Sequence, residues 1–184
     1  MRNTTIIFIF FGLLFASAIL FAFVYLPNMI DANGINSKNI VMSLPVNKTD
    51  VRYTNTGITP FCLEKNNGID FEVRQNSMVL APISGTIVDV SENRVSIQPA
   101  SNVYIYLSPV TNLNVGVGDY VHSGDILGYA VNTDVHITLD NKKNSRYECP
   151  YFYFDDASKK VLTDDLAQSP LTTNKICECD NLKY

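Results

Sequence analysis

Hydrophobic and polar residues alternate in short runs through the middle of this 184-residue chain. In residues 68–73 (GIDFEV) the alternation puts Ile69, Phe71 and Val73 on one side of an extended strand and polar residues or glycine on the other. Similar runs continue to residue 139, separated by Gly, Asp and Asn turns at a spacing of roughly 8–12 residues, with no helical period. This pattern predicts an all-β fold, either a sandwich or a small barrel.

A different pattern occupies the N-terminus, where residues 5–26 contain no charge. About 20 apolar residues suffice to cross a bilayer as a helix, whereas the apolar core of a secretory signal is usually about 7–15 residues long. The small residues Ala16, Ser17 and Ala18 offer a cleavage site, but a further mostly apolar stretch follows them. We therefore expect residues 1–27 to be an uncleaved signal anchor, a single transmembrane helix, rather than a removed signal peptide.

The rest of the chain divides into three parts. Residues 28–60 are expected to be a linker or a strap docked on the domain, with Asn39 to Val46 apolar enough for a docked strand. Residues 61–155 hold the β pattern, and residues 156–184 form a C-terminal extension with a Cys-x-Cys motif. Arg2 is the only basic residue before the anchor, which favours a cell-membrane protein with the C-terminal domain outside the cytoplasm.

The cysteines agree with an exported domain. All four follow the anchor, and an oxidising compartment makes disulfides the expected state for Cys62, Cys149, Cys177 and Cys179. Four cysteines allow three pairings, which the sequence leaves open, and a lone Cys-x-Cys disfavours a zinc knuckle. The net charge of −4 is scattered with no basic stripe, so we expect no nucleic-acid partner and membrane contact through the helix alone.

Five motifs in one order give the β region a recognisable outline. They are residues 66–70 (NNGID), 81–87 (APISGTI), 104–107 (YIYL), 115–128 (VGVGDYVHSGDILG) and 134–136 (DVH). Their order and spacing resemble the lysostaphin-type peptidoglycan endopeptidases, also called LytM-like domains, which have a duplicated hybrid motif fold. The resemblance implies a small open β-barrel with an antiparallel sheet across a groove, and a zinc ion in the groove.

Carried over position by position, the resemblance assigns both the metal ligands and the assisting catalytic residues of the site. The metal ligands become Asn66, Asp70 and His136, and the two assisting catalytic residues become Asp134 and Tyr106. Three of these five positions have lost the histidine that the family carries. The glycine-rich loop that borders the family's substrate groove is also reduced here, to residues 129–133.

The substituted residues change the expected metal chemistry. Zinc prefers imidazole and thiolate ligands, whereas one imidazole, one amide and up to two carboxylates suit harder cations such as calcium or manganese. We therefore expect any divalent metal at this site to bind weakly or not at all. Asp134 as general base and Tyr106 as oxyanion donor would both be needed for residual hydrolysis. The alternative for His136 is a hydrogen bond to Asp70 or Asp134 without metal, which we favour.

Three functions follow from this combination. The first is a membrane-anchored, catalytically degenerate LytM-like domain that binds peptidoglycan or an envelope protein as a regulator or scaffold. The second is an active zinc metalloendopeptidase of the cell wall, and the third is an accessory subunit of a membrane complex. A biotinyl-lipoyl carrier is disfavoured, because such a domain needs a lysine at a hairpin tip and none lies in the turns of the core.

Overall fold

A computed structural model describes residues 40–52, 58–59, 61, 66–165 and 176–177. These residues all belong to one compact unit, Asn36–Tyr184. The predicted anchor, residues 1–27, lies outside the described part of the chain and stays a prediction. Within the described ranges, no helix has the length and apolar character needed to span a bilayer.

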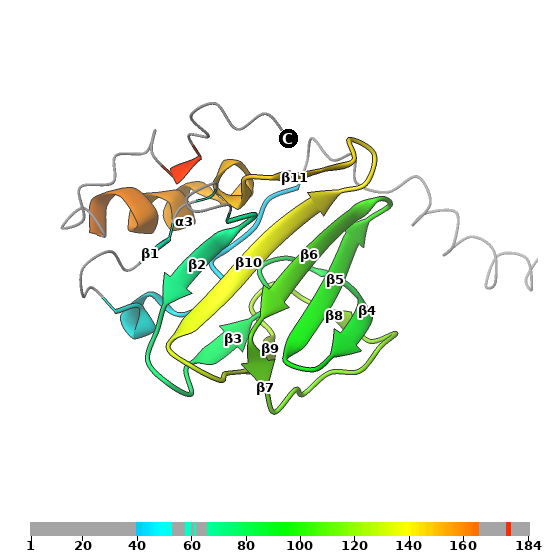
Figure 1. Cartoon of the computed structure of the whole chain (residues 1–184), viewed down its shortest axis with the longest axis horizontal. Helices are drawn as coiled ribbons and strands as arrows, with labels where there is room; N and C mark the ends of the chain where they lie inside the picture. Colours follow the sequence, from blue (N-terminus) through cyan, green and yellow to red (C-terminus); the bar gives the residue numbers. More distant parts are fainter. Residues whose placement is uncertain (1–39, 53–57, 60, 62–65, 166–175, 178–184) are drawn as a thin grey trace, which may run out of the picture. The chain divides into compact units, whose positions relative to one another are not determined.

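Two antiparallel sheets make up the domain (Figure 1). The large sheet has the strand order β1-β2-β10-β6-β5-β4-β8, and β11 lies off this path and pairs with β10. In that order the strands are β1 (Ile58–Thr59), β2 (Ile69–Glu72), β10 (Asp134–Asn141), β6 (Val103–Ser108), β5 (Arg94–Ala100), β4 (Gly85–Ser91), β8 (Tyr120–Val121) and β11 (Arg146–Glu148). The small sheet has the order β3-β9-β7, from Met78–Leu80, Ile126–Ala130 and Val110–Thr111.

The prediction of a mostly β fold is confirmed, and the described sheets stay open rather than closing into a barrel. The alternation of apolar and polar residues explains the β fold, because it gives the large sheet one apolar face that packs into the core. Its inward residues are fully or almost fully buried: Ile69, Phe71, Val95, Ile97, Ile105, Leu107, Val135, Ile137 and Leu139. The opposite face carries the polar residues of the same strands, and we call it the open face.

Two short segments border the sheets. After β11 the chain forms the 3-10 helix η4 (Pro150–Tyr153), the α-helix α3 (Asp156–Lys160) and the π-helical turn η5 (Val161–Asp165), drawn in orange beside β2 in Figure 1. A 3-10 turn, η2 (Lys48–Asp50), lies within the expected strap at residues 28–60. The strap itself packs Ile40, Met42 and Val46 into the core, and isolated bridges join Met42 to Phe154 and Val46 to Val79.

Among the described residues, a disulfide joins the domain to its C-terminal extension. Cys149 and Cys177 are bonded, with their Cα atoms 5.8 Å apart. The expectation of disulfide formation is confirmed for this pair. Cys62 and Cys179 lie outside the described residues.

Candidate functional site

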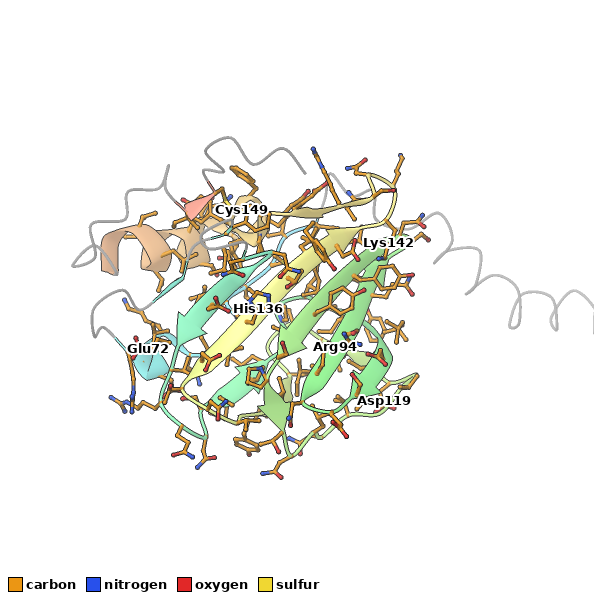
Figure 2. All side chains as sticks on the ribbon, in the orientation of Figure 1. Glu72, Arg94, Asp119, His136, Lys142 and Cys149 are labelled. Carbon is orange, nitrogen blue, oxygen red and sulfur yellow. A yellow bond between two sulfur atoms is a disulfide. The ribbon has the colours of Figure 1, made fainter. Side chains whose placement is uncertain are left out.

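The two ends of the motif series meet on the open face. Antiparallel pairing of β2 with β10 places Asp70 directly opposite His136, although the two residues are 66 positions apart in the chain. Nδ1 of His136 lies 2.6 Å from Oδ1 of Asp70. His136 is the third of the eight residues of β10 and is labelled on that strand in Figure 2. The convergence of Asp70 and His136 that the motifs predicted is therefore present.

Both ring nitrogens of His136 have protein partners. Nδ1 is hydrogen-bonded to Asp70, and Nε2 lies within hydrogen-bonding distance of the Thr138 hydroxyl, at 2.7 Å. The side-chain oxygen of Asn67 also lies 3.2 Å from Nε2. Neither Thr138 nor Asn67 was among the predicted site residues. The signal for Thr138 was its position two residues after His136, on the same face of the strand.

Asn66 completes the cluster through Asp70. Its amide nitrogen donates to Oδ2 of Asp70 at 2.7 Å, and its oxygen accepts from the backbone N–H of Gly68 at 3.1 Å. Each carboxylate oxygen of Asp70 thus has a partner, one from Asn66 and the other from His136. The three predicted metal positions are in contact, but they are bonded to one another as a hydrogen-bonded chain.

The two predicted catalytic residues lie apart from this chain of bonds. Tyr106 on β6 is in register with Thr138, while His136 faces Ser108. Tyr106 stacks beside Tyr104 with ring centroids 6.4 Å apart, and burial followed by the charge of Asp140 raises the pKa of its hydroxyl. The phenol is therefore a hydrogen-bond donor at neutral pH.

Asp134 lies at the start of β10. It faces Glu72 across the strand pair and is partly exposed. Within the described part of the chain it makes no hydrogen bond or ion pair with His136. Among the described residues, neither Asp134 nor Tyr106 is joined by a hydrogen bond to His136. Their catalytic roles stay predictions.

Comparison with known families agrees with this geometry. Residues 64–147 match the model of peptidase family M23. This part of the chain is an M23 domain. No protein with a curated description matches the sequence.

Solved structures support the same fold. A peptidase M23 structure from Pseudomonas aeruginosa, described as putative, matches 65% of this chain and 52% of its own at 20% identity and a TM-score of 0.52. Csd3 from Helicobacter pylori matches 63% of this chain and 33% of its own, at 17% identity and a TM-score of 0.51. CbpA from L. salivarius REN matches 67% of this chain and 98% of its own, at 15% identity and a TM-score of 0.50. The chain therefore spans about half the length of the Pseudomonas aeruginosa protein and about a third of the length of Csd3.

The donor set of this M23 domain does not fit the zinc that the family uses. Zinc sites of catalytic type hold the metal with three protein ligands, mostly imidazole nitrogens and carboxylates. Here a single imidazole is present, and Asp70, Thr138 and Asn67 engage its nitrogens. Among the described residues, no group of three or more His, Cys, Asp or Glu side chains is arranged to hold a metal ion.

Proposed function

We propose that this protein is a catalytically degenerate M23 domain whose open face acts as a binding surface for peptidoglycan or an envelope protein partner. In this proposal the apolar N-terminal segment anchors the domain to the cell membrane, on the outer side. The domain would then act as a regulator or scaffold rather than as a hydrolase.

The observation that carries the proposal is the hydrogen bonding of His136. A water-activating zinc needs a free nitrogen lone pair on each ligating imidazole. One of these two partners, Asp70 at Nδ1 or Thr138 at Nε2, would have to rearrange before His136 could bind a metal in that way. Asn66 offers only a neutral amide, and its amide nitrogen already donates to Asp70.

The test is a hydrolysis and binding assay with the full chain, purified in mild detergent because of the apolar N-terminus. We expect no release of soluble fragments from purified peptidoglycan, with or without added zinc. We also expect cosedimentation with insoluble peptidoglycan or capture of an envelope protein. Zinc-dependent cleavage that disappears in Asp70→Ala would overturn the degenerate assignment.

A variant that restores a histidine of the family should produce a gain in zinc affinity, which complements the expected absence of hydrolysis. Asn66→His returns a second imidazole beside Asp70 and His136, and we expect zinc affinity to rise by roughly 10–100-fold in calorimetry, the range seen when metal-site residues change. Gln75→His adds a histidine at an exposed turn and is the matched control, expected to leave zinc affinity unchanged. Wild-type zinc affinity as high as that of Asn66→His would contradict the assignment.

A further inference from the structure

The open face beside His136 carries a pair of tyrosines on β6. The rings of Tyr104 and Tyr106 have centroids 6.4 Å apart and planes inclined by 16°. Both side chains are half-buried. We call this pair the aromatic shelf.

Burial of the neighbouring side chains shows how the shelf lies. Ser96 on β5 and Thr138 on β10 flank Tyr106 in register and belong to the open face, because the residues beside each of them face the core. Yet Ser96 is only 1% exposed and Thr138 only 4% exposed. Side chains this small are covered only when larger neighbours lean over them. The Tyr106 ring is one of these larger neighbours, and it lies nearly parallel to the Tyr104 ring.

The charges around the shelf are compensated in pairs. Arg94 bonds Asp89 at 2.8 Å and also lies over the Tyr106 ring, 5.5 Å from its centroid. Lys142 bonds Asp140 at 2.5 Å, and on the other side His136 bonds Asp70. In Figure 2, Arg94, His136 and Lys142 mark three sides of this region. A charged ligand would meet no uncompensated opposite charge among these pairs.

Polar groups that can reach a ligand border the same shelf. The Gln98 amide lies against the Tyr104 hydroxyl, with its nitrogen 3.4 Å from the oxygen. The ion pair of Lys142 with Asp140 lies next to it, because Asp140 is in register with Tyr104 on the neighbouring strand. Small-molecule sites combine aromatic side chains with a few polar groups that orient the ligand, and the side chains here have that composition.

We propose that the aromatic shelf binds an uncharged sugar ring of a glycan chain. The C–H face of a pyranose is apolar and stacks on an aromatic ring, while its hydroxyls exchange hydrogen bonds with amides and with paired charges at the rim. A peptide with charged side chains has neither the apolar ring face for stacking nor the hydroxyl groups for these hydrogen bonds. The inference rests on the proposed function of the open face as a binding surface, and it names the ligand class.

The experiment titrates the full chain in detergent with the β-1,4-linked tetramer of N-acetylglucosamine, an uncharged probe, by calorimetry. We expect saturable binding by the wild type. Tyr106→Ala and, separately, Tyr104→Ala should each weaken the affinity about tenfold, the scale of one lost aromatic contact. Tyr106→Phe keeps the ring, and its affinity for the tetramer should stay within about twofold of the wild-type affinity. Phe152→Ala removes an aromatic side chain that is 67% exposed on η4, away from the shelf, and serves as the matched control.

The outcomes separate this inference from the proposed function. The sugar assignment is overturned by absence of saturable binding, or by equal binding in both alanine variants with their melting profiles intact. Binding of a sugar-free peptidoglycan peptide in place of the tetramer overturns it too, but leaves the binding function standing. Zinc-dependent hydrolysis would remove the degenerate assignment and leave the sugar inference standing when the tetramer still binds through Tyr106.

Discussion

At the scale of single residues, Gly68 makes the close packing of the His136 site possible. A Cβ atom at this position would lie 2.2 Å from the carbonyl oxygen of Ile137 and 2.7 Å from Cε1 of His136. Real Cβ atoms do not approach backbone this closely, so β2 and β10 would have to separate beside the imidazole. The hydrogen bonds of His136 to Asp70 and Thr138 depend on that separation remaining small.

We therefore expect Gly68→Ala to lower the free energy of unfolding by at least about 2 kcal/mol, as overpacking of a close contact does. Urea unfolding measures this change. Gly116→Ala is the control, because a Cβ there meets nothing nearer than 3.7 Å, and it should change stability by less than about 0.5 kcal/mol. Equal stability of the two variants would contradict the packing argument.

At the scale of elements, the corner between β11 and η4 is held by one carboxylate. Glu148 accepts hydrogen bonds from Tyr153, Asn144 and Asn141. Burial raises the pKa of Glu148, but these bonds and the charge of Arg146 outweigh it, and the pKa is lowered from its usual 4.5. Burial and the bond to Glu148 raise the pKa of Tyr153 from 10.0 to about 12.

These opposite shifts predict losses of stability at both ends of the pH range. The fold favours protonated Tyr153, so its contribution is complete below pH 10 and is lost as the pH rises towards about 12. It favours ionised Glu148, whose contribution is lost as the pH falls below about 4.5. Urea unfolding at about pH 9 and about pH 11 should show a smaller alkaline loss in Tyr153→Phe than in wild type. Tyr147→Phe, at a residue 47% exposed on β11, should keep the wild-type loss.

At the scale of the whole domain, segments from both ends of the chain complete the core. Met42 from the strap is 0% exposed and bridges Phe154, and its backbone N–H donates to the carbonyl of Tyr153 at 2.7 Å. From the other end, Ile176 is 1% exposed, next to the disulfide between Cys177 and Cys149. The β region is therefore packed against residues that lie outside the M23 match at 64–147.

Truncating the strap side chain should consequently destabilise the entire domain. We expect Met42→Ala to lower the unfolding free energy by about 2–5 kcal/mol, the range for truncation of a buried methionine. Val41→Ala is the matched control one residue away, because Val41 is 61% exposed, and it should cost less than about 0.5 kcal/mol. Thermal unfolding that is unchanged in Met42→Ala would show that the strap does not contribute to the core.

Within the β region, alternation was sufficient to predict the strands. Ile69 and Phe71 face the core and Asp70 faces out because successive side chains of a strand point to opposite faces. The meeting of Asp70 with His136 was predictable from the motifs as well. The partners Thr138 and Asn67 were not, because they depend on the rotation of one imidazole and on the register of two strands.

The sequence by itself determined the strand pattern, the M23 outline and the loss of histidines from the site, since each is a property of residue type and spacing along the chain. Tertiary structure alone decided that the nitrogens of His136 are engaged, that Cys149 pairs with Cys177, and that the nearly parallel rings of Tyr104 and Tyr106 share a face with the buried Ser96 and Thr138. The physical reason is that these contacts join strands distant in the chain, so their distances are set by sheet register and by packing that no local pattern encodes.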